Sequence, residues 1–411
     1  MNKSSDESHA AAGSHPIMGG VIVLYFVIGL EVLIMISPFA AFFYAAFNPI
    51  LLFLAKWPST HWLSAFFLPH MVMPPDALLK AVRVAGSVLF VGGALVFLVC
   101  AGQVYFHKLA RRGPALGGLY RWIRHPQYLA LAVTGLGLAI LWPRFLTVAL
   151  WAVMVALYYL LAWDEERRMV AQFGDQYRDY MERTGMFVPR PLDRLLGRIP
   201  LPQHLFPRSA VVFVVAFGLA VGTAFALRSY TVARLPLWSD GHVMVLPILP
   251  ADKAMLQHRM TAVLQMPEVR SRLQQGSGAV LGYLVPREYI MQGMIADTDP
   301  AWRIYEHHQT LAMITDWIIH PFRHLKGGHS MMHHAMSGPG ADAPSSPTVR
   351  RLIFLRVQTG RTTESPALLF GIDAIRTPQF FVDVDFHTLT ILEVKDLGPG
   401  TGWGFVPTPM F

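Results

Sequence analysis

Residues 84–106 read VAGSVLFVGGALVFLVCAGQVYF, a stretch without a single charged side chain. A helix that crosses about 30 Å of hydrocarbon needs about 20 such residues, so this stretch predicts a membrane-spanning helix. Other long apolar runs, in chain order, are Ile17–Ala55, Leu129–Leu141, Phe145–Trp163 and Ala210–Leu227. Pro38 and Asn48-Pro49 could divide the first of these, so the runs together predict a membrane all-α helical bundle of about five to six transmembrane helices.

The chain changes character after Arg228, where charged residues return and no further run is long enough to span a bilayer. Helical spacing over Asp252–Met266 and Pro300–Ile319, with strand-like alternation over Leu352–Val357 and Phe380–Val394, predicts a carboxy-terminal α+β extramembrane domain. We therefore expect a membrane domain over residues 1–208, a transmembrane helix over 209–228 and an α+β domain over 229–411.

The net charge of +8 is explained by topology, and no nucleic-acid partner is expected. Basic residues of the first half gather in His107–Pro126 and Asp164–Arg208, and short basic loops mark the cytoplasmic side of a membrane. The segment between them, Leu129–Trp163, is then a helical hairpin that turns at Trp142-Pro143-Arg144. This orientation predicts a multi-pass protein of a bacterial inner (cytoplasmic) membrane, with the residues after Arg228 in the periplasm. The lone Cys100 excludes an internal disulfide.

Three motifs between the spans carry residues suited to a small-molecule site. The first is Gly118–Tyr128, GLYRWIRHPQY; the second is Asp164-Glu165-Glu166; the third is Phe173–Tyr180, FGDQYRDY. Their order and spacing over roughly residues 85–191 resemble the isoprenylcysteine carboxyl methyltransferase and phospholipid methyltransferase family of membrane enzymes. Upstream, Ala101–Phe106 is similar to the glycine motif of the phosphatidylethanolamine N-methyltransferases, although Cys100 stands where that motif has its other glycine.

The resemblance implies a cofactor, S-adenosyl-L-methionine, held at the cytoplasmic helix ends. It implies these cofactor-binding residues: Gly102, Gln103, Tyr120, Arg124, His125, Pro126, Tyr128, Glu165 and Glu166. Arg124 and His125 could bind the cofactor's carboxylate through charged hydrogen bonds, and the two glutamates could accept from its ammonium or ribose groups. The two tyrosines could stack on adenine or face the sulfonium, and Pro126 could leave backbone groups open to the ligand.

The expected function is an integral membrane methyltransferase that acts on a hydrophobic or membrane-embedded acceptor with a carboxylate, thiol or amine. Alignment of acceptor, methyl and sulfur supplies much of the rate in such a reaction, and no catalytic base is assigned from the sequence. The alternative is a non-enzymatic membrane sensor or metal-handling protein that retains the methyltransferase scaffold. The segments between spans are too short for a Rossmann domain, so the site has to be built from helix ends.

A second candidate site is a histidine-rich segment of the carboxy-terminal half. Seven of the 17 histidines lie between His307 and His334, interleaved with methionines such as Met331 and Met332. Imidazole with thioether suits copper and imidazole alone suits zinc, although His-rich tracts are compositional signals that are also common in solvated loops. The sequence predicts a copper or zinc site formed by His320, His324, His329, His333 and His334.

Overall fold

The computed structural model describes residues 50–69, 76–110, 112–196, 205–249, 251–289, 292, 295, 296, 298, 348–358 and 365–398. Within these ranges the chain divides into two compact units. The first contains the described residues of 93–135 and 153–209, and the second contains those of 44–92, 136–152 and 210–411. Helices α4 (Ala77–Leu109), α5 (Pro126–Leu141) and α6 (Phe145–Phe173) contribute residues to both units.

Three of the described helices are long and apolar enough to cross a membrane: α4, α6 and the part Ala210–Ala233 of α9 (Leu205–Ala233). The apolar helix α5 has 16 residues and is therefore about 24 Å long, shorter than a bilayer core of about 30 Å. The count of five to six spans stays a prediction. Most of the run that begins at Ile17 lies outside the described residues, and only α2 (Ile50–Ala55) of it is described.

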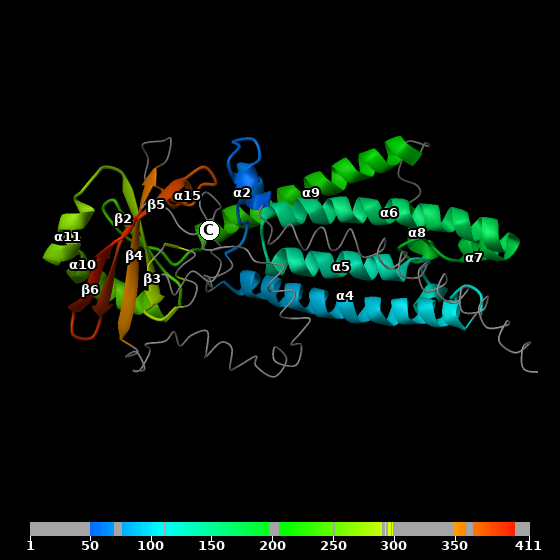
Figure 1. Cartoon of the computed structure of the whole chain (residues 1–411), viewed down its shortest axis with the longest axis horizontal. Helices are drawn as coiled ribbons and strands as arrows, with labels where there is room; N and C mark the ends of the chain where they lie inside the picture. The colour runs from blue at the N-terminus through cyan, green and yellow to red at the C-terminus, as the bar shows by residue number, and fades with distance from the viewer. Residues whose placement is uncertain are drawn as a thin grey trace, which may run out of the picture. The chain divides into compact units, whose positions relative to one another are not determined.

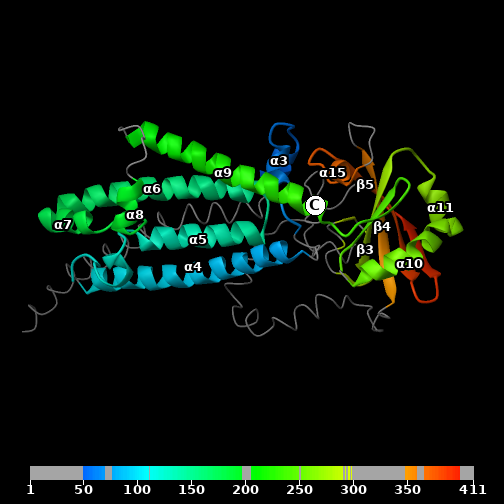
Figure 2. The same cartoon turned by 180° about the vertical axis from the view of Figure 1, so that it is seen from behind.

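Helices α4 and α5 lie side by side in Figures 1 and 2 and approach closely at glycines. A Cβ on Gly93 of α4 would lie 2.5 Å from the hydroxyl of Thr134 and 2.9 Å from the carbonyl of Ala130 on α5. A Cβ on Gly137 of α5 would collide with the backbone nitrogen of Phe90. Small residues such as these glycines let helix backbones approach closely.

The predicted turn between α5 and α6 is confirmed at Trp142-Pro143-Arg144, and a neighbouring segment holds it in place. The Phe67 N–H donates to the Pro143 carbonyl at 2.8 Å, and the Phe145 N–H donates to the Ala65 carbonyl at 3.0 Å. Arg144 is fully buried, donates to the Ser64 carbonyl and lies 4.0 Å from the ring centre of Phe66. These contacts pair turn backbone that no helix satisfies.

The short helices α3 (His61–Ser64), η1 (Gly118–Arg121), α7 (Asp175–Arg183) and α8 (Arg190–Leu196) complete the described helices before α9. After α9 comes a six-stranded sheet in the order β1-β2-β3-β4-β5-β6, with β2 (Val243–Pro247) parallel to β3 (Ala279–Pro286) and every other neighbouring pair antiparallel. The other strands are β1 (Trp238–Asp240), β4 (Val349–Gln358), β5 (Ile375–Asp385) and β6 (Thr390–Asp396). This part of the fold agrees with the predicted α+β carboxy-terminal half.

The sheet is covered on both faces. Helices α10 (Asp252–Gln265) and α11 (Pro267–Leu273) connect the parallel strands β2 and β3 and lie on one face, as Figures 1 and 2 show. A parallel pair needs such a long connection. On the other face, alternate strand residues pack with residues of α2 and α15 (Pro366–Leu369) and with Leu235. Because both faces are covered, nearly all residues of β4 are buried.

The alternation predicted over Phe380–Val394 forms two strands rather than one. β5 ends at Asp385 and β6 begins at Thr390, and the two pair as an antiparallel hairpin. Leu389 in the turn has a φ of 54°, and the Asp385 carboxylate accepts the His387 N–H at 2.8 Å. The sequence alternates through this turn, so periodicity alone did not locate it. The helix predicted over Pro300–Ile319 lies outside the described residues.

A buried ion-pair network ties β4 to β5. Asp383 is fully buried and accepts two hydrogen bonds from Arg351, at 2.7 and 2.8 Å. Arg287 reaches the same carboxylate at 2.8 Å, and Arg351 lies 3.8 Å from the ring centre of Phe381. A buried pair of this kind leaves an uncompensated charge when one partner is removed.

We predict that Gly93→Ala lowers the free energy of unfolding by about 1–3 kcal/mol, because the added methyl collides with α5. The adjacent Gly92→Ala is the matched control, since a Cβ there meets nothing within 4 Å. Unfolding of both purified variants in detergent is the measurement. Equal stability of the two variants would contradict the close α4–α5 contact.

We predict that Asp383→Asn lowers the free energy of unfolding by about 3–5 kcal/mol, because two arginines lose their buried carboxylate. The control is Asp396→Asn on β6, where the carboxylate pairs with Arg272 but its side chain is 72% exposed. That change should cost less than about 1 kcal/mol. Denaturant unfolding of the full chain compares them, and similar losses at both positions would show that the Asp383 network is not structurally important.

Candidate functional site

The segment before α5 is held by the segment after α7. Ile123 and Gly185 form a parallel bridge, the Arg124 N–H donates to the Gly185 carbonyl at 2.9 Å, and the His125 N–H donates to Met186 at 3.1 Å. Pro126 is the first residue of α5, where a missing N–H costs no helical hydrogen bond. The expectation that backbone groups here stay open to a ligand is therefore wrong for the two N–H groups of Arg124 and His125.

Two of the predicted motifs meet at a buried ion pair. The Arg124 guanidinium donates to Glu166 at 2.5 Å, and both side chains are 7% exposed. The same guanidinium donates to the Met181 carbonyl at 3.1 Å and to the Thr184 carbonyl. His125 reaches the same Glu166 oxygen at 3.2 Å. Arg124 thus joins α6 to the end of α7, and its hydrogen-bonding capacity is largely occupied.

The neighbouring Glu165 has a different environment. Its carboxylate lies 3.6 Å from Nδ1 of His125, but its side chain is 35% exposed. The His125 ring stacks on Tyr128 with 5.6 Å between ring centres, and Tyr128 stacks on Tyr158 with 5.2 Å between ring centres. This stack fixes the histidine ring, and the Glu165 side chain beside it stays partly exposed. Adjacent residues of a helix point about 100° apart, which explains the difference between the two glutamates.

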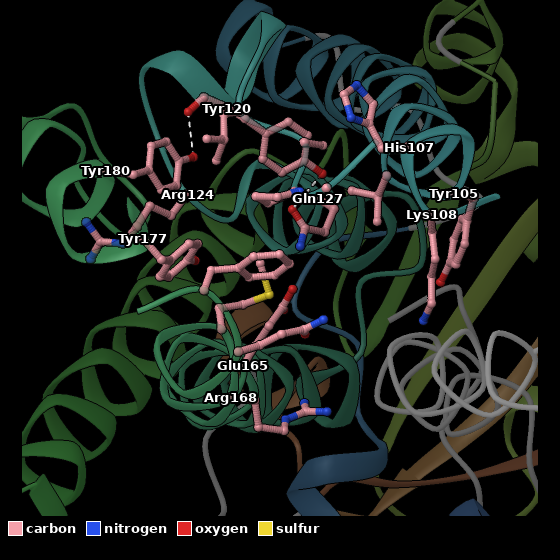
Figure 3. Close-up of a pocket in the computed structure, with 18 of the residues that line it drawn as sticks. Tyr105, His107, Lys108, Tyr120, Arg124, Gln127, Glu165, Arg168, Tyr177 and Tyr180 are labelled. Carbon is pink, nitrogen blue, oxygen red and sulfur yellow. Dashed lines mark hydrogen bonds between the residues drawn. The ribbon is translucent and has the colours of Figure 1, made fainter. Parts of the chain in front are cut away.

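A cavity of about 560 Å³ lies beside these residues, within the first unit (Figure 3). It is lined from α4, the loop before η1, η1, α5, α6 and α7. Its lining residues are Ala101, Val104, Tyr105, His107, Lys108, Gly113, Pro114, Ala115, Leu116, Tyr120, Arg124, Gln127, Tyr128, Leu161, Glu165, Arg168, Met169, Gln172, Phe173, Tyr177 and Tyr180. Cavities of about 300–1,000 Å³ are typical of small-molecule and cofactor sites.

Four of the sequence-predicted cofactor residues line this cavity: Tyr120, Arg124, Tyr128 and Glu165. Five do not: Gly102, Gln103, His125, Pro126 and Glu166. His125 and Glu166 are buried behind the lining, at 1% and 5% exposure. Gln103 donates to the Gly117 carbonyl at 3.0 Å and so fixes the loop before η1. The first two motifs therefore meet at the cavity. Some of their residues line it, while others, such as His125 and Glu166, are buried behind the lining.

Several lining residues were not singled out from the sequence. Arg168 lies one helical turn after Glu165, a spacing that places both on one side of α6. Tyr177 and Tyr180 belong to the third motif, which was recognised without assigning roles to its tyrosines. Gln127 stands between the proline and tyrosine of the first motif, where the family pattern leaves the residue type open. Lys108 was interpreted only as part of a basic loop.

The tyrosines of the site stay protonated near neutral pH. Burial, followed by the charges of Glu166 and Glu165, raises the pKa of Tyr177 well above its usual value. Burial also raises the pKa of Tyr180 to about 12 and that of Tyr120 further still. The Tyr180 hydroxyl donates to the Tyr120 carbonyl at 2.6 Å, as the dashed line in Figure 3 shows. These side chains serve as neutral hydrogen-bond donors.

The predicted metal site lies outside the described residues, since His320, His324, His329, His333 and His334 all fall in that part of the chain. Among the residues that the structure does describe, no group of three or more His, Cys, Asp or Glu side chains could hold a metal ion. Copper or zinc binding therefore stays a prediction from composition.

Comparison with known proteins agrees with the resemblance. Residues 100–176 match the model of the phospholipid methyltransferase family, which confirms the similarity over that stretch. The chain is 38% identical over 76 residues to a methanethiol S-methyltransferase of Mycobacterium tuberculosis (strain ATCC 25618 / H37Rv). The similarity covers 18% of this chain and 29% of that relative, so the chain spans under a third of the relative's length. No solved structure matches the chain.

We predict that Glu166→Gln lowers the free energy of unfolding by about 3–5 kcal/mol, because Arg124 stays buried without its carboxylate. Glu182→Gln on the exposed side of α7 is the matched control and should change stability by less than about 0.5 kcal/mol. Thermal unfolding in detergent measures both. A Glu166→Gln variant as stable as the Glu182→Gln variant would show that the pair does not hold the site together.

Proposed function

We propose that this chain is an integral membrane methyltransferase that uses S-adenosyl-L-methionine and methylates a hydrophobic or membrane-embedded acceptor. The observation that carries the proposal is the cavity beside Glu165. Its lining residues, Ala101 to Tyr180, almost coincide with the stretch 100–176 that matches the methyltransferase family. The cavity is also built from the ends of apolar helices, as a site without a separate cofactor domain requires.

The lining residues fit the chemical groups of this cofactor. Glu165 is the only acidic residue among the described residues of the lining, and a carboxylate favours a cationic sulfonium or ammonium. Arg168 and Lys108 offer donors to a carboxylate, while Tyr120 and Tyr128 offer aromatic rings. When bound, S-adenosyl-L-methionine supplies a methyl group on a positively charged sulfur.

The protein's contribution to the reaction is then binding, orientation and exclusion of water. Apolar side chains such as Val104, Leu161 and Met169 line the cavity and would keep the acceptor's reacting atom poorly solvated. Bringing two reactants into alignment can itself supply a large part of a rate enhancement. A carboxylate or thiolate acceptor carries no proton to remove, whereas a thiol or an amine releases one proton to solvent, and no residue is assigned as its base.

The wide exposure of two apolar helices supports a hydrophobic acceptor. The span of α9 is only 6% buried and that of α4 is 17% buried, so lipid would contact both widely. We propose that the acceptor reaches the cavity from the bilayer and carries a carboxylate, a thiol or an amine. The matched relative acts, by its name, on methanethiol, and this favours a thiol among the three. The arginine bias of the loops supports a bacterial inner membrane location with the carboxy-terminal half in the periplasm.

We predict that Glu165→Gln weakens binding of S-adenosylmethionine by about tenfold, because the variant loses the Coulomb attraction between the carboxylate and the cationic sulfonium. Binding of the neutral product S-adenosylhomocysteine should fall less, since its sulfur carries no charge. Calorimetry on the purified protein measures both ligands, and Glu182→Gln on α7 serves as the control. Wild-type protein that binds neither ligand would favour the non-enzymatic alternative instead.

A further inference from the structure

Gln127 presents an unused amide group to the cavity. It is the second residue of α5, it is 5% exposed, and it lines the cavity. Its Oε1 accepts the Tyr120 hydroxyl at 3.0 Å. Its Nε2 has no hydrogen-bond partner in the part of the chain that the structure describes. Because Gln127 lines the cavity, the two N–H donors of Nε2 are open to a ligand that enters it.

The orientation of this amide is fixed by a chain of hydrogen bonds from two other elements. Tyr180 of α7 donates to the Tyr120 carbonyl at 2.6 Å, and Tyr120 of η1 donates to Gln127 (Figure 3). The Tyr120 hydroxyl also lies 3.3 Å from the Cys100 carbonyl of α4. Tyr120 is only 4% exposed, so its ring cannot turn freely. The Gln127 amide is therefore preorganised before any ligand binds.

An amide held in this way has a defined recognition chemistry. Nε2 carries two donors, and Oε1 has a second lone pair beyond the one that Tyr120 uses. Donor and acceptor then lie side by side, about as far apart as the N7 acceptor and N6 amino donor of adenine. Glutamine and asparagine bind adenine through these two atoms in nucleic-acid complexes.

The surroundings of Gln127 favour a neutral base over the charged end of the cofactor. Figure 3 shows Glu165 and Arg168 together on α6 and Lys108 on another side, while Gln127 lies beside the neutral Tyr120. The charged amino acid end of the cofactor is better satisfied by the ionic side chains. The part of the cavity beside the Gln127 amide is therefore suited to an uncharged group with both a donor and an acceptor.

We propose that Gln127 is the residue that selects adenine as the base of the cofactor, and that Tyr120 is the positioning residue that orients its amide. This inference rests on the proposed function, because it presumes an adenosyl cofactor in the cavity. It adds to that proposal a specificity determinant at a motif position whose residue type the family pattern leaves open.

The test compares two ligands that differ at one position of the base. S-adenosylhomocysteine carries the 6-amino donor, and S-inosylhomocysteine carries an oxygen acceptor in its place. Calorimetry on the full chain in detergent should show that the wild type prefers the adenosyl ligand by about tenfold or more, as expected for a bidentate base contact. In Gln127→Leu and in the better shape match Gln127→Met, the preference should fall below about threefold.

The control is Gln176→Leu on α7, an exposed glutamine that does not line the cavity, and it should keep the wild-type preference. A wild-type preference retained in both Gln127 variants would overturn the inference while leaving the proposed function intact. Wild-type protein that binds neither ligand would instead remove the proposed function, and the inference with it.

Tyr120→Phe tests the positioning role, because it removes only the hydroxyl that holds the amide. Its preference for the adenosyl ligand should fall by about threefold or more, and the same change in the Gln127→Leu background should have no further effect. A loss of equal size in both backgrounds would mean that the Tyr120 hydroxyl binds the ligand directly, which would overturn the assignment that this hydroxyl acts by positioning Gln127.

Discussion

The buried ion pair between Arg124 and Glu166 is the contact on which the candidate site depends. It joins the segment before α5 to α6, and Nη1 of Arg124 donates to the carbonyls of Met181 and Thr184. A single guanidinium thus connects the first motif to the second and to the residues that directly follow the third. Two buried charges are tolerated only when they are paired and hydrogen-bonded, so this pair also fixes the geometry around it. Arg124 also lines the cavity, so the ion pair holds part of the cavity wall in place.

Apolar length was sufficient to predict the helical half of the fold. The stretch around Val84–Phe106 became α4, and the turn at Trp142-Pro143-Arg144 was located correctly because an arginine and a proline interrupt an otherwise apolar hairpin. Membrane helices are the easiest elements to infer, since each must satisfy its own backbone. The hairpin at Leu389 was harder to infer, because alternation continues through the turn and only a positive φ interrupts the strand.

The motifs also predicted which segments meet, but not how each residue is used. Glu165 and Glu166 are identical in type and adjacent in sequence, yet one faces the cavity and the other is buried against Arg124. Only the rotation of α6 relative to its neighbours decides between them, and sequence spacing does not give that rotation. Gln127 was missed for a related reason: its importance comes from a hydrogen bond to Tyr120 that no local pattern encodes.

The different roles of the two glutamates have an electrostatic consequence for the cavity. Because Glu166 neutralises Arg124, this buried arginine adds little positive potential where a cationic cofactor would bind. Arg168 on the lining is likewise paired with Asp164, at 3.1 Å. The Glu165 carboxylate then acts over a short distance in surroundings less polar than water, where Coulomb attraction is several times stronger. A site rich in basic residues can in this way still favour a positively charged ligand.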